Sequence, residues 1–127
     1  MKLLLDTHAF LWWLADDREL GAKAREEIAD GGNLVFVSAA SAWEIAVKRA
    51  AGKLEAPGDI AEWIAQSNFA PLPIEVEHAV ASAELPRHHS DPFDRLLIAQ
   101  ARLEDLALVA RNEAIDRYDV TVIDASR

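Results

Sequence analysis

Cysteine is absent from this chain of 127 residues. Disulfide bonds, thiolate metal sites and cysteine nucleophiles are therefore excluded. Basic residues are also few, because 13 Lys and Arg stand against 22 Asp and Glu, which gives a formal net charge of −9. A surface that binds polyanions passively is normally basic. If this protein acts on nucleic acid, it must recruit cations to its site or use a few local Lys and Arg residues.

Long apolar runs and glycine-rich loops are missing as well. The opening apolar run, residues 3–5, is interrupted by Asp6 and is too short for a signal peptide or a membrane span. We therefore expect a cytoplasmic protein that does not enter a membrane. The five glycines match neither a P-loop nor a dinucleotide-binding fingerprint. Binding of a phosphate by a glycine-rich loop is thereby excluded.

The composition that remains is that of one soluble globular domain, residues 1–127. A hydrophobic fraction of 51% and a charged fraction of 28% are ordinary for such a domain, and the length allows a single core. Apolar runs predict short strands at residues 3–5, 34–37, 69–74, 106–109 and 120–123. The intervening stretches predict helices at residues 10–14, 22–29, 39–51, 60–66, 76–85 and 92–104.

The alternation of strands and helices predicts an α/β fold. A mostly parallel sheet of about five strands would lie between two helical layers. Pro71 and Pro73 cannot donate hydrogen bonds to a neighbouring strand, so residues 69–74 are expected at an edge of the sheet.

Polar residues occur where the expected strands end and the helices begin. Asp6 directly follows the first strand, while Ser38 and Asn112 follow the second and fourth. Glu44 lies within the helix after the second strand, and Asp94 in the first turn of the last helix. Ligands of such folds bind outside the carboxyl ends of the strands. We therefore expect the acids to meet at one edge of the sheet.

Each of these residues also has a purely structural interpretation. Asp6 is a suitable N-cap for the next helix, and Glu44 can form a capping box with Ser41 or an ion pair with Lys48. Asp91 is better explained as an N-cap than as a ligand. An ionisable residue that closes a buried strand is harder to explain by capping, because an unpaired charge there is costly. The narrow polar stripe of Ser41, Glu44 and Lys48, on a helix expected to be mostly buried, likewise favours a site.

The histidines give weak signals. None of the four has the i,i+4 pairing of a zinc-binding helix. We interpret His8, His88 and His89 as solvated or capping residues and place His78 on a helix surface.

Several motifs together resemble the PIN-domain toxins of the VapC type. In the order of that family, and over nearly the whole chain, they are LLLDTH at residues 3–8, VSAASAWEIAVK at 37–48, DPFDRLLIAQA at 91–101, LVARNE at 108–113, and Tyr118. The resemblance implies a three-layer α/β/α PIN domain that cleaves RNA with Mg²⁺ or Mn²⁺. It further implies the toxin of a VapBC-type toxin–antitoxin pair, which binds a VapB-type antitoxin and forms a homodimer.

By motif position, Asp6, Glu44 and Asp94 take the places of the three principal acids of that family, with Thr7 and Ser38 in support. Carboxylates are hard donors suited to these cations, so Asp6 and Asp94 are candidates for direct ligands. Glu44 would hold a metal-bound water or act as general base. Without a cation, three clustered carboxylates should raise at least one pKa. Three basic residues near the acids are candidates for contacts to RNA phosphates, namely Lys48, Arg95 and Arg111. Each of them taken singly is better explained by a surface ion pair.

The chain departs from the family pattern at the fourth acidic position. It has Ala110-Arg111-Asn112 where the family commonly shows Thr-Arg-Asp or Thr-Arg-Asn. Asn112 adds no negative charge, which favours one firmly held cation over two. A catalytically weakened PIN-fold binding module that acts through a protein partner is therefore an alternative. A haloacid-dehalogenase-type phosphatase is disfavoured, because His8 stands where that class needs a second acid.

Overall fold

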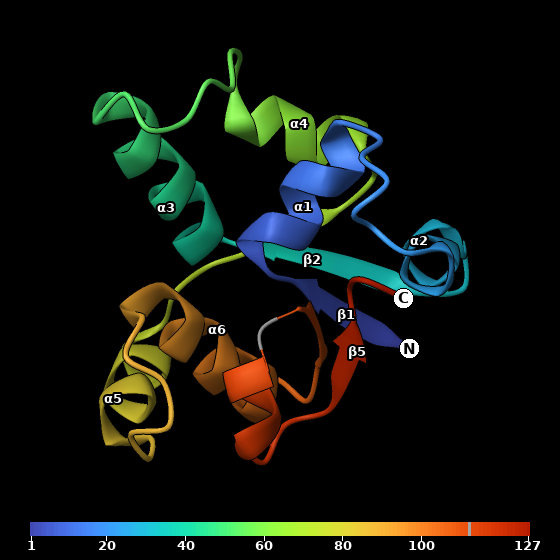
Figure 1. The fold of residues 1–127 in the computed structure, drawn as a ribbon. Coiled ribbons are helices and arrows are strands. Elements are labelled where there is room, and N and C mark those ends of the chain that lie inside the picture. The colour runs from blue at the N-terminus through green and yellow to red at the C-terminus, as the bar shows by residue number, and fades with distance from the viewer. Residues whose placement is uncertain (112) are drawn as a thin grey trace.

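The computed structural model describes residues 1–111 and 113–127 of the chain. Over these ranges five parallel strands form one sheet, with the order β3-β2-β1-β4-β5 (Figure 1). The strands are β1 (Lys2–Leu5), β2 (Leu34–Ser38), β3 (Ala70–Leu72), β4 (Ala107–Ala110) and β5 (Val122–Asp124). The short β3 lies at an edge, as its proline predicts. The predicted α/β fold is confirmed, and the sheet is parallel throughout.

Helices connect the strands. They are α1 (Thr7–Leu14), α2 (Ala22–Ala29), α3 (Ala39–Ala50), α4 (Ile60–Gln66), α5 (Val76–Glu84) and α6 (Pro92–Leu103), with a 3₁₀ helix η1 (Glu113–Arg117). The bounds of α2 and α4 are those expected from sequence, and α1 begins earlier because Asp6 caps it. The 3₁₀ helix was not predicted. Among the described residues, no helix combines the length and the apolar character that a membrane crossing requires.

Two apolar clusters cover the two faces of the sheet. Leu3 and Leu5 point to one face, where they pack with residues of α1, α2 and α4. Leu4 points to the other face and packs with residues of α6 and η1. This alternation is the period of two expected for a strand that is buried on both sides. Figure 1 shows the resulting arrangement of helices above and below the sheet, which confirms the three-layer prediction.

The strand register brings three strand ends to the same level. Leu5 is paired with Val37 on β2 and with Val109 on β4. The residues that follow these three, Asp6 among them, therefore lie together at the carboxyl edge of the sheet. The Asp6 amide donates to the Val109 carbonyl at 3.0 Å, which continues the β1–β4 pairing up to the acid itself.

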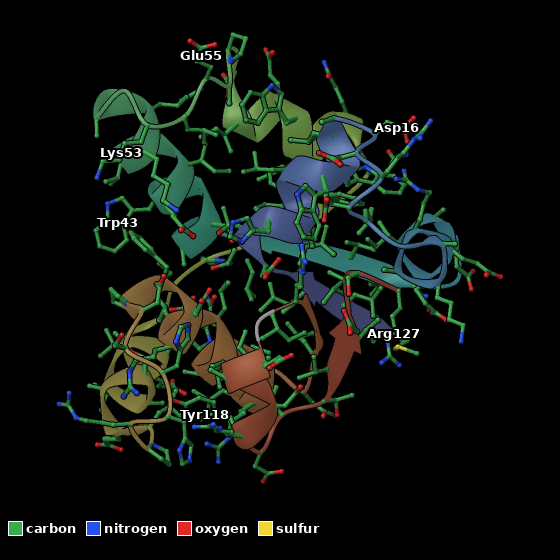
Figure 2. The ribbon with its side chains drawn as sticks, viewed as in Figure 1. Asp16, Trp43, Lys53, Glu55, Tyr118 and Arg127 are labelled. Atoms are coloured by element: carbon green, nitrogen blue, oxygen red, sulfur yellow. The ribbon has the colours of Figure 1, made fainter. Side chains whose placement is uncertain are left out.

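Helix α3 is less buried than the sequence predicts. Its apolar residues Trp43 and Val47 are 57% and 46% exposed. Trp43 lies on the outer side of α3, with its ring centre 5.0 Å from that of Phe93 on α6 (Figure 2). Ser41 and Glu44, by contrast, are buried. The expectation was wrong because the polar stripe finds hydrogen-bond partners beneath the helix, and several apolar residues are left facing outward.

Candidate metal centre

Asp6 closes β1 and begins α1. Its Oδ1 accepts a hydrogen bond from the Ala9 amide at 2.7 Å, so the capping interpretation is confirmed. The side chain is nevertheless buried at the sheet edge. Burial raises the pKa of Asp6 from 3.8 to about 7; the Ala9 amide opposes this rise, and the charges of Asp94 and Glu44 add to it. The mutual repulsion expected of clustered carboxylates is therefore present.

Glu44 lies on the inner side of α3, only 4% exposed, with a partner at each oxygen. The Thr7 hydroxyl donates to Oε1 at 2.6 Å, and Lys48 Nζ donates to Oε2 at 2.7 Å. The same Thr7 oxygen lies 3.1 Å from Ser41 Oγ. The predicted Glu44–Lys48 ion pair is confirmed, and the orientation of the buried carboxylate is fixed from both sides.

Ser38, rather than Ser41, caps α3. Its Oγ accepts a hydrogen bond from the Ala40 amide at 2.9 Å, so the capping box expected of Ser41 is wrong. The Ser38 hydroxyl also donates to Gln100 Oε1 at 2.5 Å. Ser38 thus joins α3 to α6, and it supports the edge of the sheet through this link.

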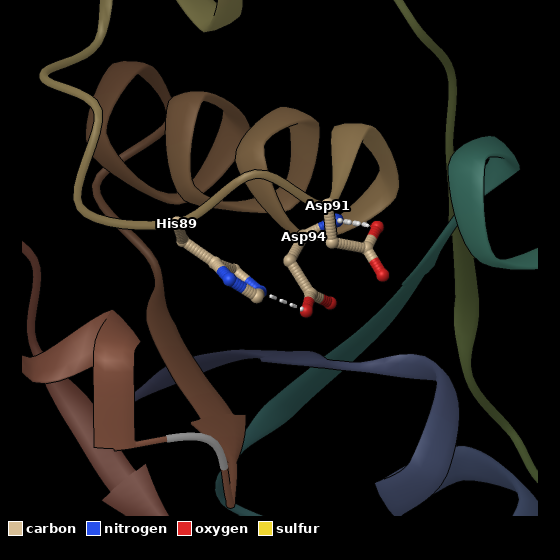
Figure 3. Close-up of side chains that lie close together, drawn as sticks. All are labelled: His89, Asp91 and Asp94. Carbon is tan, nitrogen blue, oxygen red and sulfur yellow. Dashed lines mark hydrogen bonds and ion pairs between the residues drawn. The ribbon is translucent and has the colours of Figure 1, made fainter.

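Asp94 lies in the first turn of α6 beside two other polar side chains. Asp91 is the N-cap, and its Oδ1 accepts hydrogen bonds from the amides of Phe93 and Asp94 at 2.8 and 3.2 Å, as expected. His89 Nε2 lies 2.7 Å from Asp94 Oδ2 (Figure 3). Burial raises the pKa of Asp94, the hydrogen bond from His89 opposes the rise, and the charges of Asp91 and Glu44 add to it.

Two of the three acids meet at an open pocket of about 290 Å³. Asp6 and Asp94 both line it, together with His8, Trp12 and Arg111. The Glu44 charge acts on Asp6 and on Asp94, although Glu44 does not itself line the pocket. His89, Asp91 and Asp94 form a second group of possible metal ligands, which shares Asp94 with the pocket. One ligand atom of each residue lies within 4.8 Å of the other two.

Two of the basic residues named from sequence lie close to the acids. Lys48 has a raised pKa, chiefly because of its hydrogen bond to Glu44. Arg111 lines the pocket and pairs with Glu19 at 2.9 Å, while its guanidinium lies 5.9 Å from the centre of a Trp12 ring. Both side chains keep partly exposed cationic groups near the carboxylates.

Arg95 has a different position from the one expected. Its two terminal nitrogens donate to backbone carbonyls at 2.8 to 3.2 Å. One belongs to Ser82 in the last turn of α5, and the others belong to Leu85, Pro86 and His89 in the segment between α5 and α6. A phosphate contact does not fit this arrangement, because the donors that it needs are already used to hold the segment.

Sequence reasoning also misplaced two histidines. His78 is buried at 2% exposure, accepts a hydrogen bond from the Glu75 amide at 2.9 Å, and lies 2.9 Å from a Glu104 oxygen. His89 contacts Asp94 instead of being solvated. Its position five residues before Asp94 was the only available signal, and that spacing has no meaning until the turn between the two residues is known. The expectation for Asn112 lies outside the described residues.

Comparison with known proteins gives the family. A protein-family model for the PIN domain matches residues 3–120. The chain belongs to the PIN domain family. A search of curated proteins found no match for this PIN domain.

Solved structures share its fold. VapBC2 from Rickettsia felis, bound to a promoter DNA fragment, has a TM-score of 0.71 at 15% identity, covering 97% of this PIN domain and 98% of the other chain. DNA-bound VapBC from Salmonella typhimurium has a TM-score of 0.68 at 20% identity, with 98% of each chain covered. A toxin–antitoxin complex from Klebsiella pneumoniae has a TM-score of 0.66 at 22% identity, with 97% of each chain covered.

The donor set of this PIN domain fits a hard divalent cation. The acids that converge at the pocket offer carboxylate oxygens, which suit Mg²⁺ and Mn²⁺. The raised pKa values of Asp6 and Asp94 show that the protein alone accommodates their negative charges poorly. A cation at this position would offset both burial and mutual repulsion.

Proposed function

We propose that this PIN domain is a metal-dependent endoribonuclease that acts as the toxin of a VapBC-type toxin–antitoxin pair, with residues 1–127 forming one domain. The pocket that Asp6 and Asp94 line together carries this proposal, with Glu44 near enough for its charge to act on both. Membership of the PIN family and structural similarity to VapBC complexes support it.

In this proposal Asp6 and Asp94 are the direct ligands of Mg²⁺ or Mn²⁺. When bound, such a cation supplies a more acidic water and neutralises charge that develops on the phosphate. Glu44, whose carboxylate is held by Thr7 and Lys48, would orient the attacking water or accept a proton from it. Both oxygens of Glu44 already accept hydrogen bonds, which favours this role over direct ligation.

Other residues shape the site around these three. Thr7 orients Glu44, Ser38 fixes the start of α3, and Asp91 fixes the start of α6. Lys48 and Arg111 are the proposed contacts for RNA phosphates, because a protein with a net charge of −9 needs local cations to approach a polyanion. Asn112 remains a proposed supporting residue.

We expect this protein to bind a VapB-type antitoxin, to form a homodimer and to act in the cytoplasm. The similar structures from Rickettsia felis and Salmonella typhimurium are VapBC assemblies, which supports an antitoxin partner. The apolar surface that Trp43 and Val47 leave exposed on α3 supports an interface with another chain.

The decisive experiment is to sequence the 5′ ends of cellular RNA fragments after controlled expression. Wild-type protein should create new, discrete ends, and Asp6→Ala should create none. The same set of ends from both proteins would contradict endoribonuclease activity at this site.

A weakened binding module is the second candidate. Ala110 favours it, because this buried alanine of β4 has no hydroxyl where the family commonly has threonine. Titration of metal-free protein with Mn²⁺ separates the two candidates. An active centre should bind Mn²⁺ more tightly in the wild type than in Asp6→Ala, whereas a degraded site should show no difference.

A further inference from the structure

The segment between α5 and α6 is held by two anchors from outside it. The Tyr118 hydroxyl accepts hydrogen bonds from the amides of His88 and His89, at 3.2 and 3.0 Å, and donates to the Pro86 carbonyl at 2.7 Å. Arg95 donates to the carbonyls of Pro86 and His89 at 3.0 and 3.2 Å. Tyr118 is buried and follows η1, so its hydroxyl brings a distant part of the chain to this segment.

His89 is the residue that both anchors share. Its backbone N–H donates a hydrogen bond to the Tyr118 hydroxyl, and its backbone C=O accepts one from Arg95. Its side chain is hydrogen-bonded to Asp94. The two side chains in this last contact are only 17% and 19% exposed. His89 is thus fixed at three points, one of them by the distant Tyr118. Together these contacts hold the imidazole against the carboxylate (Figure 3).

The contact determines how the Asp94 carboxylate can be used. An ionised carboxylate only accepts hydrogen bonds, so with Asp94 ionised this contact requires an N–H at His89 Nε2, which donates a hydrogen bond to Oδ2. Among the described residues, nothing donates to the other oxygen, Oδ1, which therefore remains available to a cation. Hydrogen bonds from outside the ligand set are known to fix the orientation of ligating groups in metal sites.

We infer that His89 is a positioning residue for Asp94, and that Arg95 and Tyr118 act through it by fixing the segment that carries it. This inference rests on the proposed function, because it assigns to Asp94 the role of metal ligand. It gives Arg95 a role in the site that differs from the phosphate contact expected from sequence. It also explains why a polar segment of the surface is tied so firmly to Tyr118.

The test measures Mn²⁺ affinity of metal-free protein without RNA, by electron paramagnetic resonance of the free ion. His89→Ala should weaken binding by roughly tenfold or more, the usual effect of removing a hydrogen-bond partner of a ligand. His89→Gln keeps a side-chain N–H donor and should recover part of this loss. Ser90→Ala is the matched control, since it shortens an exposed side chain of the same segment and should leave the affinity unchanged.

A double-mutant cycle tests the anchors. Tyr118→Phe should weaken Mn²⁺ binding in the wild type and have no further effect in the His89→Ala background, because its influence passes through His89. Arg95→Lys should follow the same pattern. Circular dichroism of each metal-free variant verifies the fold. An equal loss of affinity from Tyr118→Phe in both backgrounds would show a general structural role and overturn the assignment of the anchors.

Asp94→Asn separates failure of this inference from failure of the proposed function. If Asp94→Asn weakens Mn²⁺ binding and His89→Ala does not, Asp94 is a ligand and the positioning role of His89 is wrong. If Asp94→Asn binds Mn²⁺ as tightly as the wild type, the proposed metal centre itself is wrong.

Discussion

The Thr7 hydroxyl donates a hydrogen bond to Glu44 Oε1 at 2.6 Å, across 37 positions of the chain. This contact joins Thr7, the first residue of α1, to the inner side of α3. Because Lys48 holds the other oxygen at 2.7 Å, the Glu44 carboxylate has a single well-defined orientation. The edge of the sheet is therefore organised by side-chain hydrogen bonds as well as by the strand register.

Replacing Thr7 by valine removes this hydroxyl while preserving the branched shape of the side chain. Loss of a donor to a buried carboxylate costs on the order of 1–3 kcal/mol, and Glu44 would be free to reorient. We expect Thr7→Val to lower the rate of RNA cleavage by about tenfold or more at saturating Mn²⁺. Thr121→Val, at an exposed position before β5, is the control. Equal rates for both variants would show that Glu44 does not depend on Thr7.

Asp94→Asn should abolish RNA cleavage and leave the fold intact. An amide has almost the same shape as the carboxylate but carries no charge, so it binds a divalent cation poorly. Cleavage of a fluorescent RNA, together with the circular dichroism spectrum, measures both effects. Asp119→Asn changes an exposed acid and should behave like the wild type. Near wild-type cleavage by Asp94→Asn with Mn²⁺ supplied would contradict the assignment.

The stability of the metal-free protein should fall as pH rises from about 4 to about 7. Burial raises the pKa of Asp6 from 3.8 to about 7, so in this range the folded state binds the proton that the unfolded state releases. Ionised Asp6 then opposes folding by as much as ~4 kcal/mol above pH 7.

Asp6→Asn removes this pH dependence and keeps an oxygen for the Ala9 amide. In urea unfolding with a chelator, the variant should be more stable than the wild type at pH 8, and the difference should disappear near pH 4. A difference that does not change with pH would show that Asp6 ionises in the folded protein as easily as in the unfolded chain.

Arg111→Gln should weaken RNA binding, because this guanidinium lies at the pocket that Asp6 and Asp94 line. Its pair with Glu19 is exposed and contributes little to stability, so the fold should be retained. Loss of one phosphate contact should reduce the slope of log affinity against log salt by roughly one. Binding of single-stranded RNA in the uncleaving Asp94→Asn background measures this slope. Lys2→Gln, at the opposite end of β1, is the control and should leave the slope unchanged.

The fold could be predicted from sequence because its signals are local. Each buried strand is a short apolar run, and the helix beginnings carry residues that cap them in the structure, such as Asp6 and Asp91. The prolines correctly marked β3 as an edge strand. Helix α3 was misjudged because its composition does not show which side faces inward. Its buried side carries the apolar Ile45 together with Glu44, whose hydrogen-bond partner Thr7 comes from another element.

The candidate site could be predicted only in part. Asp6 and Asp94 were named from their positions, and the structure brings them to one pocket. Capping and site roles proved compatible, since Asp6 both caps α1 and lines that pocket. The contact of His89 with Asp94 was missed. Arg95 was expected in a surface ion pair or at an RNA phosphate, but it binds the segment that carries His89.

The sequence by itself determined the order of strands and helices, the acidic side chains and their places at element ends. These depend on apolar periodicity and capping, which act over a few residues. Only the tertiary structure decided which side of α3 is buried, which oxygens of Glu44 and Asp94 are engaged, and what holds His89. These features depend on hydrogen bonds between residues far apart in the chain, such as that from the His89 amide to Tyr118, and on burial, which raises the pKa of Asp6.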